Sequence, residues 1–177
     1  MRRVAKTFWA SCLKLESVRR LILRANDLTS GRLLLLLFLV LFCAVVISSA
    51  WVSDDAYITF RSIDNWLNGY GLRWNVAERV QSYTHPLWML AVSGVYAATG
   101  EIYWSALGLG VLTSVATVAL VGFGIARSTT TGILAIGPLI LSKAFVDYST
   151  SGLENPLTHF LLAAFYWVLF NHSQHKN

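Results

Sequence analysis

Long apolar runs alternate with short polar segments along this chain. The run from Leu33 to Trp51 carries no charged residue, and neither does the run from Tyr103 to Ala126. About 20 residues are enough to cross roughly 30 Å of hydrocarbon as a helix. Two shorter runs, 131–146 and 157–170, extend through polar flanks. The pattern therefore predicts an all-α polytopic membrane protein with about four transmembrane helices.

A fifth apolar segment, Pro86–Ala98, is too short to be read as a fifth span. Its length is typical of an interfacial or re-entrant helix. If it crossed the membrane, Arg127 would lie outside. If it stays on the outer surface, Arg127 is cytoplasmic and segment 147–156 emerges on the same outer face as Asp54 and Asp55. The second arrangement obeys the positive-inside rule at Arg127, and we adopt it.

Charge is concentrated at the start of the chain, which has 55% hydrophobic and only 13% charged residues. Eight of the 14 Lys and Arg fall in residues 1–32, so the net charge of +5 indicates a cytoplasmic N-terminus rather than nucleic-acid binding. We expect a multi-pass protein of the cytoplasmic (inner) membrane.

The topology divides the chain into nine expected segments. The first part consists of a cytoplasmic basic amphipathic leader (1–32), a first transmembrane helix (33–51) and a first outer loop (52–102) with juxtamembrane helices 54–68 and 86–98. The remainder consists of a second transmembrane helix (103–126), a cytoplasmic loop (127–130), a third transmembrane helix (131–146), a second outer loop (147–156), a fourth transmembrane helix (157–170) and a polar tail (171–177).

The first outer loop opens with a pattern typical of an amphipathic helix. Ser53 or Asp54 can cap it, an apolar stripe follows at helical spacing, and the glycines of Gly69-Tyr-Gly71 end it. The stripe consists of Ala56, Phe60, Ile63 and Leu67. We expect this helix to lie along the membrane surface with its polar side towards water or a cavity.

Two adjacent carboxylates, Asp54 and Asp55, stand at the start of that helix. A single Asp there is explained by capping or by the helix dipole. Two are not, because adjacent carboxylates repel each other and one then holds its proton more tightly. At a lipid boundary such a pair suits a general base that removes a proton from a sugar hydroxyl.

Further polar residues in both outer loops suggest a site at this surface. Arg61, Arg79, Tyr83 and His85 lie among the aromatic residues of the first loop, and Lys143, Asp147 and Glu154 belong to the second outer stretch. Aromatic rings can stack on sugars and an arginine can hold a phosphate. Simpler explanations are an interfacial aromatic belt and a plain i, i+4 ion pair between Lys143 and Asp147.

Two blocks of this sequence resemble a known family. "DDAYITFRSIDNWLNGYGLRWNVAERVQSYTHPLWML" and "KAFVDYSTSGLENPL" are similar to the N-terminal part of bacterial GT-C glycosyltransferases, and most similar to the mycobacterial terminal β-(1→2) arabinofuranosyltransferase group. The resemblance implies a GT-C-like N-terminal module, surface-lying helices, and an acidic pair acting as catalytic base, carried here by Asp54 and Asp55. It also implies a polyprenyl-phosphate sugar as donor.

From these features we expect sugar transfer, with inversion, from the lipid-phosphate donor to a cell-envelope glycan. Asp55 takes the acceptor proton beside Asp54, while Arg79, Arg61 or Lys143 stabilises the departing phosphate. His85 either assists there or satisfies the start of the short helix. A divalent cation on Asp54, Asp55 and Glu154 is compatible with carboxylate chemistry, although nothing requires one and no metal-ligand spacing occurs.

The chain is much shorter than typical members of this superfamily, so we expect a truncated form. The alternative function is a non-catalytic membrane subunit, or an inactive remnant, that packs with a partner membrane protein. The glycines Gly108, Gly110, Gly122 and Gly124 would allow another helix to approach closely. An intramembrane aspartyl protease fits less well, because its catalytic acids would have to lie within two separate spans.

Overall fold

The computed structural model describes residues 29–78, 80 and 82–174, and these are helical or irregular. The expected amphipathic leader therefore lies almost entirely outside the described residues, as does Arg79. After a first helix, Thr29–Ser48, the elements follow in the order α2 (Asp54–Leu67), α3 (Pro86–Thr99), α4 (Ile102–Ala119), the π-helical turn η1 (Leu120–Ile125), α5 (Thr129–Leu141), α6 (Lys143–Tyr148) and α7 (Asn155–Gln174).

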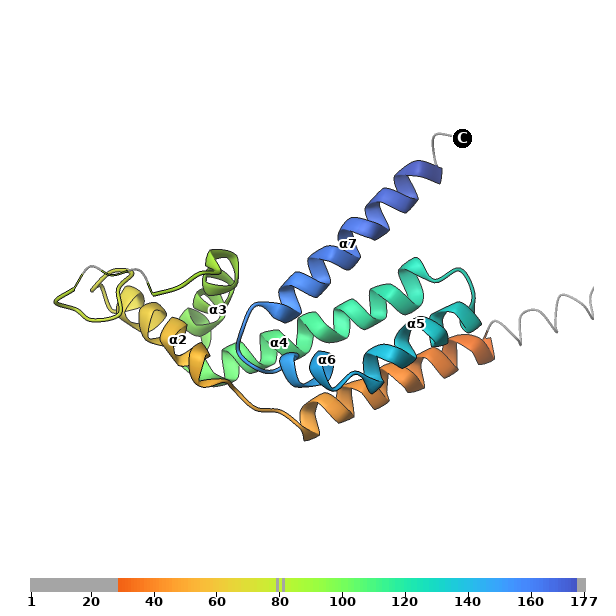
Figure 1. The fold of residues 1–177 in the computed structure, drawn as a ribbon, viewed down its shortest axis with the longest axis horizontal. Helices are drawn as coiled ribbons and strands as arrows, with labels where there is room; N and C mark the ends of the chain where they lie inside the picture. The colour runs from red at the N-terminus through yellow and green to blue at the C-terminus, as the bar shows by residue number, and fades with distance from the viewer. Residues whose placement is uncertain (1–28, 79, 81, 175–177) are drawn as a thin grey trace, which may run out of the picture.

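The helix Thr29–Ser48, α4 and α5 run side by side along the long axis of the molecule (Figure 1). Their shared core combines residues of the first helix with Val118, Ile136 and the α6 residues Phe145 and Val146. The first helix contributes Leu35, Phe42 and Val46, one or two turns apart on one face. Helix α7 starts beside α4 and contacts both α4 and η1, where Trp167 lies close to Gly124.

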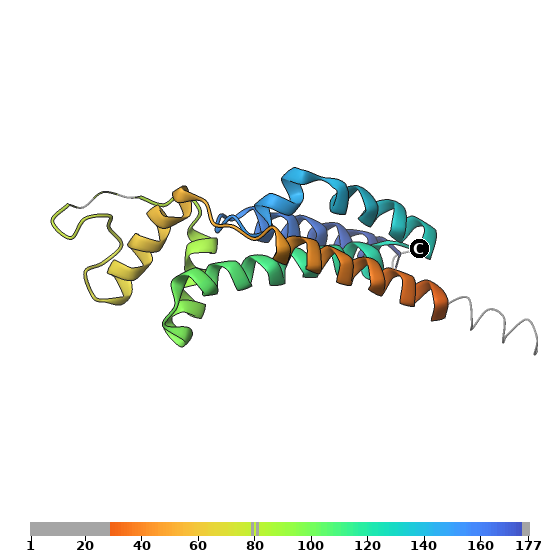
Figure 2. The same ribbon diagram turned by 90° about the horizontal axis from the view of Figure 1, so that it is seen from below.

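Helices α2 and α3 stand at one end of these long helices, where Thr29–Ser48 ends and α4 begins (Figures 1 and 2). Ala56, Phe60 and Ile63 of the expected stripe are buried against α3, whereas Leu67, at the end of α2, is 42% exposed. Gly100 ends α3 in the left-handed conformation, with φ of 74°. Helix α4 can then start at Ile102 in a new direction, so α3 is a separate short helix.

The segment 131–146, expected as one helix, forms two. Helix α5 ends at Leu141, and α6 begins at Lys143 after Ser142, whose side chain accepts a hydrogen bond from the Phe145 N–H. Serine competes for backbone groups in this way and favours helix starts. The segment 157–170 belongs to a longer helix, because α7 runs from Asn155 into the expected polar tail at Gln174.

Two of the described helices are long and apolar enough to cross a membrane, namely Thr29–Ser48 and Ile102–Ile125. The apolar helices Pro86–Thr99, Thr129–Leu141 and Asn155–Phe170 are shorter. Many leucines on the outer face of the first helix are exposed, among them Leu33, Leu37 and Leu41 at 51–58%. An apolar surface of this extent indicates a membrane protein, and four spans remain a prediction.

Candidate active site

A cavity of about 310 Å³ lies where the two polar connections meet. It is lined by residues of α2, of the segment before α3 and of the turn before α7. These are Asp55, Ile58, Thr59, Ser82, Tyr83, Thr84, His85, Leu153 and Glu154. Four residues singled out in the sequence, Asp55, Tyr83, His85 and Glu154, are therefore brought to one place.

His85 joins three parts of the cavity wall. Its Nδ1 is 3.1 Å from Glu154 Oε2 and 3.2 Å from Thr84 Oγ1, while its Nε2 is 3.1 Å from Thr59 Oγ1. A carboxylate only accepts hydrogen bonds, so a hydrogen bond from Nδ1 to Glu154 requires the imidazole tautomer with its proton on Nδ1. The His85 side chain is 13% exposed and that of Glu154 is 42% exposed, so the acid reaches the cavity mouth.

Backbone contacts hold the two connections together. The Ser53 N–H donates to the Ser151 carbonyl at 2.8 Å, and the Trp51 N–H donates to Thr150 Oγ1 at 3.2 Å. Next to them, the buried indole of Trp88 donates to the Gly152 carbonyl at 2.8 Å. Segments about 100 residues apart in sequence thus form one wall at the end of the molecule that carries α2 and α3.

Three helices begin at this cavity, because Asp55 lies in the first turn of α2, and His85 and Glu154 immediately precede α3 and α7. Helix N-termini carry partial positive charge and favour nearby anions. Asp55 and Glu154 are therefore in surroundings that suit carboxylates, and the same field favours an anionic ligand.

Asp54 does not line the cavity, although it is adjacent to Asp55. Its Oδ1 accepts hydrogen bonds from the Asp55 N–H at 3.1 Å and the Ser53 hydroxyl at 3.2 Å. Asp54 is thus engaged locally at the start of α2, but the expected capping is not formed, because Ser53 precedes the helix and makes no side-chain capping hydrogen bond. No group of three or more His, Cys, Asp or Glu side chains that could hold a metal ion occurs among the described residues. The three-carboxylate arrangement considered from the sequence is therefore not formed.

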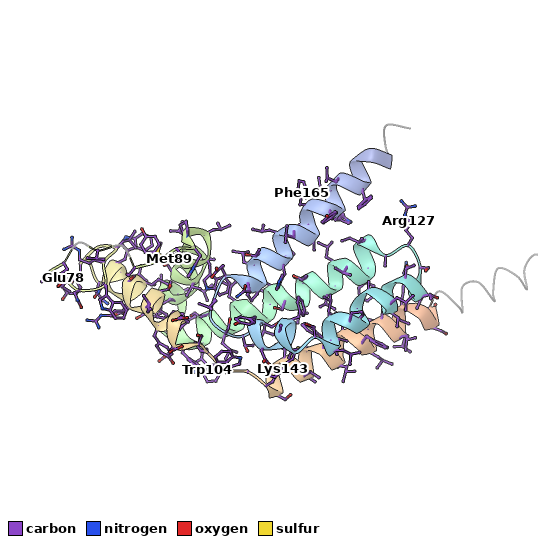
Figure 3. The ribbon with its side chains drawn as sticks, in the orientation of Figure 1. Glu78, Met89, Trp104, Arg127, Lys143 and Phe165 are labelled. Atoms are coloured by element: carbon purple, nitrogen blue, oxygen red, sulfur yellow. The ribbon has the colours of Figure 1, made fainter. Side chains whose placement is uncertain are left out.

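The other proposed ligand-binding residues lie outside the cavity lining. Arg61 donates to Asn75 Oδ1 at 3.0 Å and lies over the Trp74 ring at 4.6 Å from its centroid. Lys143, on α6 (Figure 3), forms an i, i+4 ion pair with Asp147, which confirms the simpler interpretation of that spacing. Among the described lining residues His85 is the only basic group.

Sequence reasoning missed Thr59, which is buried and lines the cavity. A usable signal was present, because Thr59 follows Asp55 by four residues and the two therefore share a helix face. Ser82 was missed as well. Its hydroxyl bonds to that of Ser62 and fastens the segment before α3 to α2.

The long apolar helices indicate the class, a membrane protein, and an acid-lined cavity lies at one end of these helices. Comparison with curated proteins then finds similar sequences. The chain is 27% identical over 135 residues to the terminal β-(1→2)-arabinofuranosyltransferase of Mycobacterium tuberculosis, covering 70% of this chain and 22% of the relative. It is 33% identical over 111 residues to the protein of the same name from Corynebacterium glutamicum, covering 59% of this chain and 16% of the relative.

The chain resembles these arabinofuranosyltransferases, and the similarity supports a glycosyltransferase-like function at the level of the family. It matches about a fifth of the length of these relatives. No family model matches the chain. No solved structure matches it either.

Proposed function

We propose that this chain forms the membrane-surface part of a glycosyltransferase. The enzyme moves a sugar, arabinofuranose by analogy with the relatives, from a polyprenyl-phosphate donor to a hydroxyl of a cell-envelope glycan. The reaction takes place at the outer face of the cytoplasmic membrane. The observation that carries the proposal is the presence of Asp55 and Glu154, from two distant connections, in one cavity bridged by His85.

Asp55 is the proposed general base. It accepts the proton of the acceptor hydroxyl as that oxygen bonds to the anomeric carbon of the donor sugar. The bond from this carbon to the phosphate oxygen breaks at the same time, and the phosphate leaves with the electron pair. The sugar has oxocarbenium character in this transition state, and attack from the face opposite the phosphate inverts the anomeric centre.

The remaining lining residues serve binding and positioning in this proposal. The ring of Tyr83 offers a face for a sugar, and Thr59 and Glu154 offer groups for sugar hydroxyls. The departing phosphate is stabilised by His85 and by the partial positive charge at the starts of α2, α3 and α7. Arg79, three residues before Ser82, remains a proposed phosphate ligand.

Membranes containing the full chain test this proposal. They are given a radiolabelled polyprenyl-phosphate arabinofuranose and an arabinan oligosaccharide, and both transfer and photo-crosslinking of a donor analogue are measured. We expect Asp55→Asn to lower transfer by about 10²–10⁴-fold and to leave donor crosslinking in place. The matched variant Asp54→Asn, one residue outside the cavity, retains most of the transfer.

Two results would overturn the proposal. In the first, Asp55→Asn transfers sugar as fast as the unaltered chain. In the second, the unaltered chain neither transfers the sugar nor crosslinks to the donor analogue, which would favour a non-catalytic membrane subunit.

The surface at Gly110 is not open to a partner helix, because it already packs against another part of this chain. A Cβ at position 110 would lie 2.6 Å from the Ser149 carbonyl oxygen.

A further inference from the structure

A second cavity, of about 560 Å³, lies between η1, α5 and α7. It is at the opposite end of the long helices from the acid-lined cavity, near the turn that carries Arg127 (Figure 3). Its lining is apolar apart from Arg127 and Thr131, and the apolar members are Val121, Gly124, Ile125, Ala126, Ala135, Trp167 and Phe170.

Arg127 is the only charged residue of this lining. It is exposed, and it makes no hydrogen bond or ion pair with any described residue. Figure 3 shows its side chain projecting from the turn between η1 and α5 towards the side on which α7 lies. A guanidinium group at the mouth of an apolar groove is complementary to an amphiphile with an anionic head.

The π-helical turn and Gly124 shape the groove. A Cβ at position 124 would lie 3.2 Å from Cδ1 of Trp167 and 2.8 Å from Cδ1 of Leu120. The glycine therefore allows the indole of Trp167 to lie close to the backbone of η1. Trp167 remains 41% exposed and forms one side of the groove, and tryptophan is enriched where a membrane protein meets the lipid interface.

The volume of the groove favours a thin occupant. A helix is a cylinder about 10 Å across, and it would fill 560 Å³ within a length of about 7 Å, or roughly five residues. An acyl chain is much thinner than a helix, so the same volume holds a longer stretch of it. Residues 1–28 are a poor alternative, because they carry seven Lys or Arg and thus the same sign of charge as Arg127.

We propose that this groove binds an acyl chain of an anionic membrane phospholipid, whose headgroup pairs with Arg127. The site is separate from the acid-lined cavity and does not depend on glycosyl transfer. One cation near a membrane surface gives roughly a fivefold preference for anionic over zwitterionic lipid. Arg127 projects from the turn between η1 and α5, so the headgroup would lie at the end of the long helices that carries this turn.

Fluorescence quenching of Trp167 in the purified full chain tests this proposal. The chain is placed in mixed micelles that contain brominated phosphatidylglycerol or, at the same mole fraction, brominated phosphatidylcholine. Subtracting the emission of Trp167→Phe isolates the signal of Trp167 from that of the other tryptophans. We expect phosphatidylglycerol to quench this signal several-fold more effectively than phosphatidylcholine.

Three variants locate the effect. Arg127→Gln should abolish the preference for phosphatidylglycerol, whereas Arg32→Gln, which removes an exposed cation from the first helix, should leave it intact. Ala135→Phe introduces a ring at an exposed position of the lining and should reduce quenching by both lipids. Equal quenching by the two lipids, a preference that survives Arg127→Gln, or full quenching in Ala135→Phe would overturn the proposal.

Discussion

The indole N–H of Trp88 donates a hydrogen bond of 2.8 Å to the carbonyl oxygen of Gly152, and both residues are buried. This contact joins the start of α3 to the turn before α7, next to the acid-lined cavity. Gly152 has a φ of 79°, which side chains other than glycine rarely adopt. The cavity therefore depends on a backbone conformation as well as on its polar side chains.

Gly152→Ala is expected to destabilise the protein by about 2–4 kcal/mol, the sum of a left-handed backbone penalty and local overpacking. The added Cβ would lie 2.7 Å from the Cβ of Ala56 and 3.0 Å from Cγ1 of Val52. Thermal unfolding in detergent measures the change. Gly100→Ala is the matched control, because Gly100 has a φ of 74° and nothing within 4 Å of an added Cβ. It should cost only about 1 kcal/mol, and equal losses would show that packing at Gly152 contributes nothing.

Lys143→Ala is expected to change stability by less than about 0.5 kcal/mol and to leave sugar transfer unchanged. The Lys143 side chain is 86% exposed, and its partner Asp147 is its neighbour one turn along α6. Neither residue lines the cavity. The transfer assay and thermal unfolding measure the two effects. A large loss of sugar transfer would show that Lys143 contributes to the active site after all.

Tyr96 is expected to make stability fall at alkaline pH. Its hydroxyl donates to Asp64 Oδ1 at 2.8 Å, and this bond, together with burial and the charges of Asp64 and Glu101, raises the pKa of Tyr96 above 10.0. The pKa of Tyr96 is higher in the folded chain than in the unfolded chain. The stabilisation that Tyr96 contributes is therefore complete below about pH 10 and is lost as pH rises through the raised pKa.

Melting temperatures of the unaltered chain and of Tyr96→Phe, compared from pH 8 to pH 11, measure this effect. The phenylalanine variant lacks both the hydrogen bond and the titrating proton. It should melt lower than the unaltered chain at pH 8, and the difference should shrink above pH 10. A difference independent of pH would show that Tyr96 acts through packing alone.

Local sequence signals account for much of the fold. The stripe Ala56, Phe60 and Ile63 predicts the buried face of α2, and Pro86 and Gly100 mark the limits of α3. The break at Ser142 was not predicted, because apolar residues continue on both sides of the pair Ser142-Lys143. At the break the Ser142 side chain accepts a hydrogen bond from the backbone at the start of α6, an interaction that a hydropathy pattern does not detect.

The candidate site was predictable only in part. Two acids in separate connections predicted a shared site, but which of them reach a cavity depends on the turn at Gly152 and on the bonds of His85. Asp54 and Asp55 are indistinguishable in the sequence, and it is the start of α2 that directs Asp54 to local backbone and hydroxyl groups. Tertiary contacts of this kind produce no periodic pattern in the amino-acid sequence.

The sidedness of the two connections is tested by impermeant maleimide labelling of intact cells. In a background of Cys12→Ser and Cys43→Ala, we expect Tyr148→Cys to be labelled from outside and Arg127→Cys only after permeabilisation. Tyr148 suits this purpose because it is 44% exposed, whereas Thr150 nearby is buried. The reverse pattern would place the acid-lined cavity in the cytoplasm and contradict the proposed use of a lipid-linked donor outside it.

Crosslinking across the cavity tests the central claim most directly. Thr84→Cys and Glu154→Cys in the cysteine-free background place one thiol on each connection at the cavity lining. A short bifunctional methanethiosulfonate should join them in native membranes, whereas the pair Thr84→Cys and Arg127→Cys, at opposite ends of the long helices, should not react. Efficient crosslinking of the first pair alone is the predicted result. Absence of that crosslink, with both cysteines still labelled individually, would contradict a site built from the two connections.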